Sequence, residues 1–140
     1  MKGFFITFEG VEGSGKSTQI NLLAERLEEN GKEVVLTREP GGTKLGEKIR
    51  DLLLDPDNID IDDRAEILLY AADRAQHVKK KIIPALNEGK IVLADRYFDS
   101  NIAYQGYGRK LEMKMVRKIN EWVIRDVWPD LTILLDIDPQ

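Results

Sequence analysis

Short apolar runs alternate along this chain with longer segments in which apolar residues recur at helical spacing. The runs predict strands near 4–8, 33–37, 90–94 and 131–137, and the spaced apolar positions predict helices near 16–29, 44–54, 63–82 and 111–127. The second, third and fourth strands are uninterrupted apolar runs, which is typical of strands buried on both faces. This alternation predicts an α/β fold, a doubly wound parallel sheet with helices on both faces.

Length and composition narrow the possibilities. The 140 residues suit a single domain, 1–140, and they are 42% hydrophobic and 33% charged, with a formal net charge of −4 and no cysteine. These values argue against a membrane span, a strongly basic nucleic-acid surface, disulfides and thiolate metal sites. From this composition and charge we expect a small-molecule partner, no nucleic acid and no membrane. Because no secretory or transit segment is visible, we also expect a cytoplasmic location.

Residues 10–17, GVEGSGKS, stand between the first predicted strand and the first predicted helix. This spacing in this context is typical of a phosphate loop, whose backbone N–H groups and helix N-terminus replace the water around a di- or triphosphate. Lys16 is placed to reach the outer phosphates, and the Ser17 hydroxyl is placed to ligand Mg²⁺. The alternative is a glycine-rich turn that spells the motif without binding. The predicted nucleotide-binding residues are Gly10, Val11, Glu12, Gly13, Ser14, Gly15, Lys16, Ser17 and Thr18.

Further polar clusters follow the second strand and lie on the long helix. Arg38 opens TREPGGT at 37–43, where an ordinary turn with an exposed arginine is the alternative. Tyr70 and Arg74 stand four residues apart on one helical face and could grip a planar base, although core packing of Tyr70 is an alternative. His77 is expected to be structural. Strand ends meet at one crevice in such sheets, so these clusters should converge on the phosphate loop.

The third strand ends in Asp95-Arg96, and Ser100, Asn101, Tyr104 and Gln105 follow. An aspartate at the end of a buried strand beside a phosphate loop can hold Mg²⁺, and an adjacent arginine can neutralise a transferring phosphate. A simple ion pair at the strand end is the alternative. The predicted metal ligands are therefore Ser17 and Asp95.

The last residues, LLDIDPQ, are expected to form a buried strand that runs into a turn at the functional edge of the sheet. We therefore expect the domain to be incomplete at its C-terminal end, without a further helix and strand and without a lid.

Four segments, GVEGSGKST, TREPGGT, LLYAADRAQH and DRYFDSNIAYQG, together resemble thymidylate kinases. The resemblance implies phosphoryl transfer from Mg-ATP to thymidine 5′-monophosphate, giving dTDP and ADP in deoxynucleotide biosynthesis. It implies that Glu12 faces the sugar hydroxyl of the acceptor and that Arg38 and Arg96 hold phosphates. With Lys16, these are the expected catalytic residues.

The same resemblance assigns the acceptor site. It implies that the position of Tyr70 stacks on thymine and that Arg74 binds a base oxygen. It implies that Ser100 and Asn101 lie near the base edge and that Tyr104 crowds the 2′ position of the sugar, and Gln105 is expected among the substrate-binding residues as well. A homodimer is implied as well, with Trp122 as a candidate contact or, alternatively, part of the monomer core.

Two positions depart from the family pattern. Tyr70 stands where phenylalanine is usual, which adds a hydroxyl that needs a partner. Gly13 stands where some members carry an arginine, and the members that lack this arginine place the basic residue in a lid instead.

Two other functions remain open at this point. One is a different phosphate-loop nucleoside or nucleotide kinase, which would share Lys16 and Ser17 but differ around Tyr70 and Tyr104. The other is an ATP-binding regulatory module without enzymatic activity. The Asn-Lys-x-Asp motif of guanine-specific switches is missing from the sequence.

Overall fold

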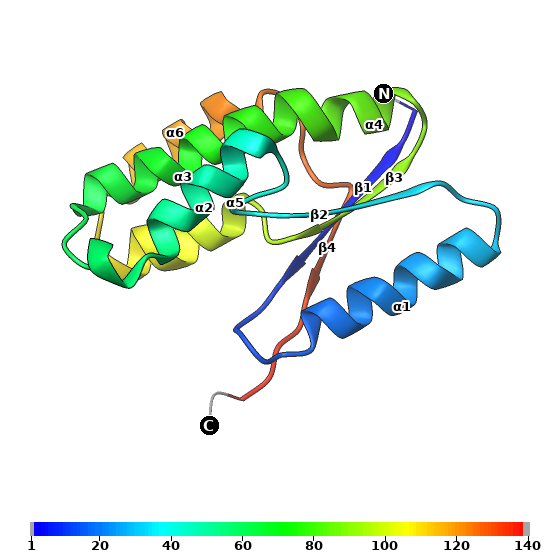
Figure 1. Ribbon diagram of the computed structural model, residues 1–140, viewed down its shortest axis with the longest axis horizontal. Coiled ribbons are helices and arrows are strands. Elements are labelled where there is room, and N and C mark those ends of the chain that lie inside the picture. The colour runs from blue at the N-terminus through cyan, green and yellow to red at the C-terminus, as the bar shows by residue number, and fades with distance from the viewer. Residues whose placement is uncertain (1, 139–140) are drawn as a thin grey trace.

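A four-stranded parallel sheet forms the centre of the computed structural model, which describes residues 2–138 (Figure 1). The strands are β1 (Phe4–Glu9), β2 (Val34–Arg38), β3 (Ile91–Asp95) and β4 (Leu131–Leu134). Their order is β2-β3-β1-β4, and every neighbouring pair is parallel. The predicted α/β class and the parallel sheet are confirmed.

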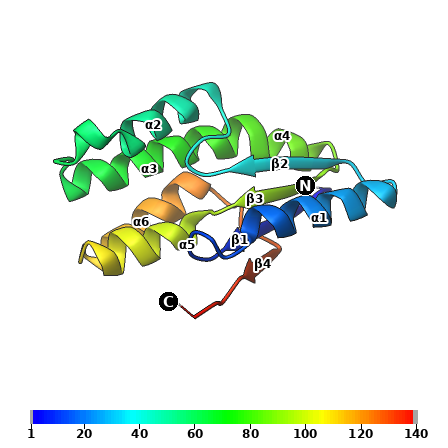
Figure 2. The ribbon, with the colours of Figure 1, turned by 60° about the horizontal axis from the view of Figure 1, so that its bottom comes forward.

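Helices cover both faces of the sheet, as expected, but unequally (Figure 2). On one face lies α1 (Lys16–Glu29), and the other carries α3 (Asp63–His77), α4 (Ile83–Asn87) and α6 (Met113–Ile124), with α2 (Lys44–Leu54) packed on α3. The Thr43 hydroxyl caps α2 at the Gly46 N–H, and Asp62 caps α3, which satisfies backbone donors that have no partner inside the helix. Within residues 2–138, no helix is both long and apolar enough to cross a membrane.

The core is divided into two layers by the alternation of side chains along β1 and β3. Phe5 points to the face covered by α3, α4 and α6, whereas Ile6 and Phe8 point to the face covered by α1. Because successive side chains of a strand alternate between faces, the apolar run of β1 supplies both layers. A strand buried on both faces therefore holds the two halves together.

The outer strands differ from the expectation. β1 and β3 are central and buried, but β2 and β4 are edge strands, and Leu134 of β4 is 65% exposed. The prediction that the apolar runs in the second and fourth strands are buried on both faces is therefore wrong for this chain. An apolar run shows that its residues favour burial, but the order of the strands in the sheet determines how many of them are buried.

The long predicted helix and the C-terminal elements also differ in their limits. A π-helical segment, Val78–Ile82, joins α3 to α4, so the helical path runs past 82 to Asn87. The last helix is shorter than expected, and β4 ends at Leu134 rather than at 137. The expected final turn lies partly outside the described residues, which end at 138.

One segment that periodicity did not predict is central to the site. The chain after β3 forms a single helical turn, α5 (Phe98–Ser100), and continues as a π-helical segment, Asn101–Gly108. Short, irregular helical turns have too few residues to show a period, so sequence patterns do not reveal them. A 3₁₀ turn, Pro56–Asn58, is the other unpredicted element.

The two-layer core makes a direct prediction about neighbouring phenylalanines. Phe5 is fully buried, with its ring 5.0 Å from that of Tyr97, whereas Phe4 is 44% exposed. Phe5→Ala should lower the free energy of unfolding by about 3–5 kcal/mol, because it removes a large buried side chain and leaves a cavity. Urea denaturation measures this, and Phe4→Ala is the matched control. Equal losses in the two variants would contradict the assignment of the core.

Candidate functional site

The carboxyl ends of β1, β2 and β3 surround a cavity of about 590 Å³. The predicted residues in its wall are Glu12, Gly13, Gly15, Lys16, Ser17, Thr18, Arg38, Tyr70, Asp95 and Arg96. Gly10, Val11 and Ser14 belong to the same loop but are not part of this wall. The structure thus brings together clusters that lie far apart in the sequence, as expected for parallel strands whose ends share one crevice.

A second cavity of about 640 Å³ adjoins the first and shares Glu12, Tyr70 and Arg96 with it. Its wall also contains Tyr104 and Gln105, which were predicted, and Glu66 and Arg109, which were not. Two sites with common wall residues can hold two ligands close to one another. We call the first the loop cavity and the second the side cavity.

The phosphate loop has the backbone that its glycines predict. Gly13 and Gly15 have φ values of 75° and 92°, and nothing lies within 4 Å of where a Cβ would be, so here glycine is needed for conformation and for ligand approach. A Cβ at Gly10 would lie 2.9 Å from the Leu135 carbonyl oxygen. α1 begins at Lys16, and Lys16, Ser17 and Thr18 line the loop cavity, so the N–H groups of the first helical turn lie at its wall.

Lys16 is buried, and its Nζ donates to the carbonyl oxygens of Gly10 at 2.8 Å and Val11 at 3.2 Å. These contacts hold the ammonium group inside the loop while its side chain lines the loop cavity. A charge held this way is already close to where a bound phosphate would lie. The arrangement suits a polyphosphate better than a neutral ligand.

Ser17 and Asp95 fit a divalent cation. Both line the loop cavity, and one carboxylate oxygen of Asp95, Oδ1, is buried without a hydrogen-bond partner among the described residues. Residues 2–138 contain no cluster of three or more His, Cys, Asp or Glu that could hold a metal. A magnesium ion here would therefore take its remaining oxygen ligands from water and phosphate, which is its usual preference.

The two predicted phosphate-binding arginines are held in different ways. Arg38 is half exposed and pairs with Glu47 of α2 at 3.2 Å. Arg96 has a φ of 72°, a strained conformation for a side-chain-bearing residue, and its guanidinium lies 5.4 Å from the centre of the Tyr104 ring. The turn at Arg96 directs the side chain back over the phosphate loop, with Nη2 3.5 Å from the Gly10 carbonyl oxygen.

Tyr70 lines both cavities, but Arg74 does not accompany it. The Arg74 guanidinium is only 1% exposed and donates to Glu39 at 2.6 Å, to Asn120 at 2.7 Å, to the Tyr97 carbonyl oxygen and to Asn101. The predicted clamp, in which both side chains face a planar base, is therefore wrong. The helical spacing does place Tyr70 and Arg74 on one face of α3, but the ion pair with the buried carboxylate of Glu39 holds the Arg74 guanidinium in the interior.

The remaining predicted acceptor residues divide in the same way. Tyr104 and Gln105 line the side cavity, whereas Asn101 is buried between Arg74 and Gln105. The Ser100 hydroxyl donates to Glu9 at 2.9 Å, and Ser100 is not part of either cavity wall. Sequence order alone could not separate the residues that face the cavity from those that support it.

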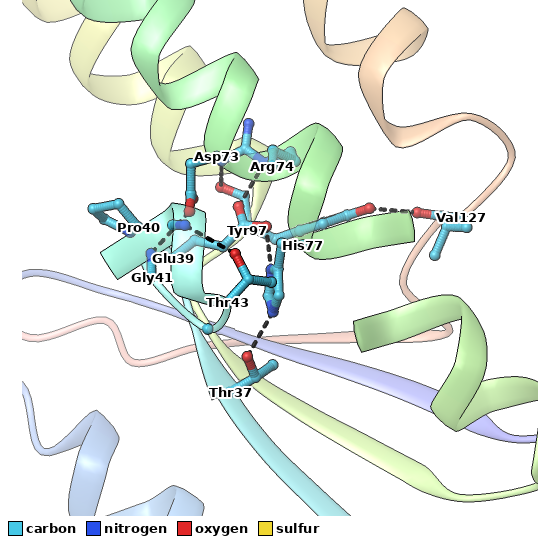
Figure 3. A network of polar contacts seen from close by, with 12 residues as sticks. Thr37, Glu39, Pro40, Gly41, Thr43, Asp73, Arg74, His77, Tyr97 and Val127 are labelled. Carbon is cyan, nitrogen blue, oxygen red and sulfur yellow. Dashed lines mark hydrogen bonds and ion pairs between the residues drawn. The ribbon is translucent and has the colours of Figure 1, made fainter. Parts of the chain in front are cut away.

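A buried network of ionisable groups supports the loop after β2 (Figure 3). Glu39 accepts from Arg74 and pairs with His77 at 2.7 Å, and His77 in turn contacts the Thr37 hydroxyl. Burial alone would raise the pKa of Glu39, but the charge of Arg74 and the contacts with His77 hold it below its ordinary value. His77 is structural, as expected, because it fixes the end of β2 against α3.

Asp73 belongs to the same network and accepts from the Gly41 N–H at 3.0 Å (Figure 3). Burial, together with the nearby charge of Glu39, raises the pKa of Asp73 to about 7. Its Oδ2 is buried without a hydrogen-bond partner among the described residues. This helix thus fastens the loop 39–43 through adjacent residues, Asp73 and Arg74.

Sequence reasoning missed Glu9, the last residue of β1. It is buried and accepts from the Tyr97 N–H and the Ser100 hydroxyl, each at 2.9 Å, and burial raises its pKa to about 7. It therefore ties the strand before the phosphate loop to the segment that follows Arg96. A charged residue closing an apolar strand was the signal that could have found it.

Arg50, Glu47 and Glu66 were missed as well. Arg50 of α2 donates to the Pro40 carbonyl oxygen at 2.9 Å and adds a positive charge to the wall of the loop cavity. All three lie on helices among many exposed charged residues. Nothing in the pattern distinguishes them from a solvated helical face.

Comparison with known proteins gives a consistent result. The sequence profile of the family described as "Thymidylate kinase" matches residues 8–140. A curated thymidylate kinase of Halothermothrix orenii is 64% identical over 99% of this chain and 66% of its own length, and one of Nitratidesulfovibrio vulgaris is 56% identical over 97% and 61%. The chain therefore spans slightly less than two thirds of these relatives.

A crystal structure of thymidylate kinase from Ehrlichia chaffeensis superposes with a TM-score of 0.90. It is 48% identical in sequence, and the match covers 99% of this chain and 78% of that one. The arrangement of strands and helices described above is thus one that a solved relative shares.

The raised pKa of Glu9 predicts how stability depends on pH. The folded protein binds this proton more tightly than the unfolded chain, so the stabilising effect of protonation is complete below pH 4.5 and is lost as the pH rises towards 7. Glu9→Gln removes this pH-dependent loss of stability, because the amide of glutamine does not ionise. Relative to the unmodified chain, the variant should gain at most about 1.4 kcal/mol per pH unit in that window.

Urea denaturation at pH 5, 6, 7 and 8 measures the difference between the two proteins. Glu25→Gln, on the exposed side of α1, is the control and should give a difference independent of pH. A constant difference for Glu9→Gln across the series would show that Glu9 is not the group whose pKa is raised.

Proposed function

This chain belongs to the thymidylate kinase family, and from that premise we propose that it transfers a phosphoryl group from Mg-ATP to thymidine 5′-monophosphate, giving ADP and dTDP. The observation that supports this most directly is that the loop cavity and the side cavity share Glu12, Tyr70 and Arg96. A donor phosphate held by the phosphate loop and an acceptor held against Tyr70 would then lie within reach of each other. Such positioning is most of what phosphoryl transfer requires of a protein.

The phosphate loop is proposed to bind the phosphates of ATP. The N–H groups at the start of α1 would donate to phosphate oxygens, and Lys16 would exchange its contacts with loop carbonyls for a contact with the outer phosphates. Ser17 and the unpaired oxygen of Asp95 would hold Mg²⁺, which when bound supplies charge neutralisation on the phosphates.

The side cavity is proposed to bind the acceptor nucleotide. Tyr70 would stack on the base, Tyr104 would crowd the 2′ position of the sugar and Glu12 would face a sugar hydroxyl. Arg74 is not assigned to the base in this proposal, because its guanidinium is buried against Glu39 and Asn101. Arg74 instead holds the segment after β3 in place from the interior, through its hydrogen bonds to Asn101 and the Tyr97 carbonyl oxygen.

The charge that develops during transfer is proposed to be stabilised by Lys16, Arg38 and Arg96. Arg38 can turn from Glu47, since that ion pair is half exposed and weak. No general base is needed, because an acceptor phosphate oxygen is already ionised at neutral pH. Glu12 therefore orients the acceptor rather than removing a proton.

A homodimer is proposed to form through α3 and α6. A groove of about 330 Å³ lies between these helices and is lined by apolar side chains that include Leu68 and Met115. Further along α6, Trp122 is 83% exposed. A large exposed aromatic on a helix that also lines an apolar groove is typical of a surface that another chain covers.

The activity is tested with the chain, Mg-ATP and a panel of nucleoside monophosphates, following ADP and nucleoside diphosphate by chromatography. We expect dTMP to be the best acceptor and dUMP to be next, because one methyl group distinguishes them by only about 10- to 200-fold. Lys16→Ala should lower the rate by about 100-fold or more, while Lys80→Ala, an exposed lysine, should not. ADP formation that needs no acceptor would argue for a nucleotide-hydrolysing module instead.

The dimer is tested by sedimentation velocity. Trp122→Glu should shift the population towards monomer, because it places a charge in an apolar interface. Leu22→Glu, an exposed apolar position on α1 at the opposite face of the sheet, is the matched control and should leave the mass unchanged. A monomer for the unmodified chain at micromolar concentration would refute this proposal.

A further inference from the structure

A chain of hydrogen bonds runs from Arg74 to the wall of the side cavity. Arg74 Nη1 donates to Asn101 Oδ1, Asn101 Nδ2 donates to Gln105 Oε1 at 2.9 Å, and Gln105 Nε2 donates to Glu66 Oε1 at 3.1 Å. α3 supplies both terminal groups, and the π-helical segment 101–108 supplies the two amides between them.

The donor-to-acceptor direction of these hydrogen bonds is determined at both ends of the series. A guanidinium has only donors, so the group of Asn101 that faces Arg74 must be its carbonyl oxygen. A carboxylate has only acceptors, so the group of Gln105 that faces Glu66 must be its NH₂. The two ends require the same orientation of both amides, and a flip of either amide would break two contacts at once.

Burial makes that orientation costly to reverse. Asn101 is 1% exposed and Gln105 is 4% exposed, so a hydrogen bond lost at either amide is costly. Glu66 is held in turn by Arg109, whose Nη2 lies 3.1 Å from the second carboxylate oxygen. The acceptor end of the chain is therefore itself fixed in place.

This series of hydrogen bonds also determines which side of the Gln105 amide faces a ligand. Its carbonyl oxygen points to Asn101, which is not in the wall of the side cavity, whereas its NH₂ points to Glu66, which is. One N–H of that group is used by Glu66, and the other has no partner among the described hydrogen bonds. Gln105 thus offers a donor on the cavity side.

We propose that Glu66 is a specificity-determining positioning residue, which orients Gln105 as a hydrogen-bond donor and so favours a pyrimidine with a carbonyl group over one with an amino group. The inference rests on the proposed function, because it assumes that a nucleotide base occupies the side cavity. A carbonyl oxygen accepts from Gln105, whereas the amino group of cytosine would place a donor against a donor. Glu66 itself acts through Gln105 and needs no contact with the ligand.

The test is equilibrium binding of dTMP, dCMP and ATP to the chain, measured by isothermal titration calorimetry. In Glu66→Gln the terminal group can donate as well as accept, so only the contact with Asn101 still favours the original orientation of Gln105. We expect the preference for dTMP over dCMP to fall by about 5- to 10-fold, the worth of one hydrogen bond. ATP affinity should change less than about two-fold, which also reports that the variant is folded.

Asp63→Asn is the matched control. Asp63 lies one turn earlier on α3 and faces the same Arg109 at 3.7 Å, but the hydrogen bonds of the Gln105 side chain among the described residues go to Asn101 and Glu66. Asp63→Asn therefore removes a negative charge from the same helix but leaves the hydrogen bonds of Asn101 and Gln105 unchanged. Its ratio of dTMP to dCMP affinity should equal that of the unmodified protein.

The outcomes separate the two proposals. If the unmodified chain prefers dTMP and Glu66→Gln keeps that preference, the role of Glu66 is wrong and the proposed function stands. If both variants lose the preference equally, the effect comes from the charge and not from the amide orientation, which also overturns the inference. A chain that binds neither pyrimidine nucleotide contradicts both proposals.

Discussion

The buried ion pair between Arg74 and Glu39 is the interaction on which the walls of the site depend. Through Arg74 it joins four parts of the chain: the loop after β2, helix α3, the segment after β3 and helix α6. Two buried charges are costly to remove from water, and the cost is offset only where the remaining donors and acceptors are also satisfied. The contacts of Arg74 with two asparagines and a backbone carbonyl meet that condition.

The same pair explains why ionisable groups in this region behave differently from one another. Glu39 lies against a cation that lowers its pKa, whereas Asp73 forms no ion pair among the described residues, and burial together with the charge of Glu39 raises its pKa to about 7. Glu9, at the end of β1, resembles Asp73 in this respect. Carboxyl groups of one type thus differ because of the neighbours that the fold gives them.

The site combines rigid and strained elements. The phosphate loop and Arg96 both have left-handed backbone conformations, and both lie at the ends of central strands. Central strands are covered on two faces, so they can hold strained turns at their ends. On α3 and the segment 101–108, Glu66 and Gln105 of the side-cavity wall are held by side-chain hydrogen bonds instead, and Arg74 supports them from the interior through Asn101.

Much of the fold and part of the site could be predicted from the sequence. Apolar runs and helical periodicity identified every strand and the long helices, and the phosphate loop was evident because its chemistry is encoded in consecutive residues. The convergence of Arg38, Tyr70, Asp95 and Arg96 also followed, since it depends only on the parallel direction of the strands. Local patterns are sufficient for features whose physical cause is local or repeats along the chain.

Tertiary structure alone decided which way the polar side chains face. Tyr70 and Arg74 lie one turn apart on the same face of α3. Arg74 is nevertheless buried against Glu39, whereas Tyr70 lines both cavities. Strand order likewise determined that the apolar run of β4 is an exposed edge while that of β3 is covered. Such outcomes depend on partners distant in sequence, because burial and the pairing of charges are properties of the surroundings rather than of the residue.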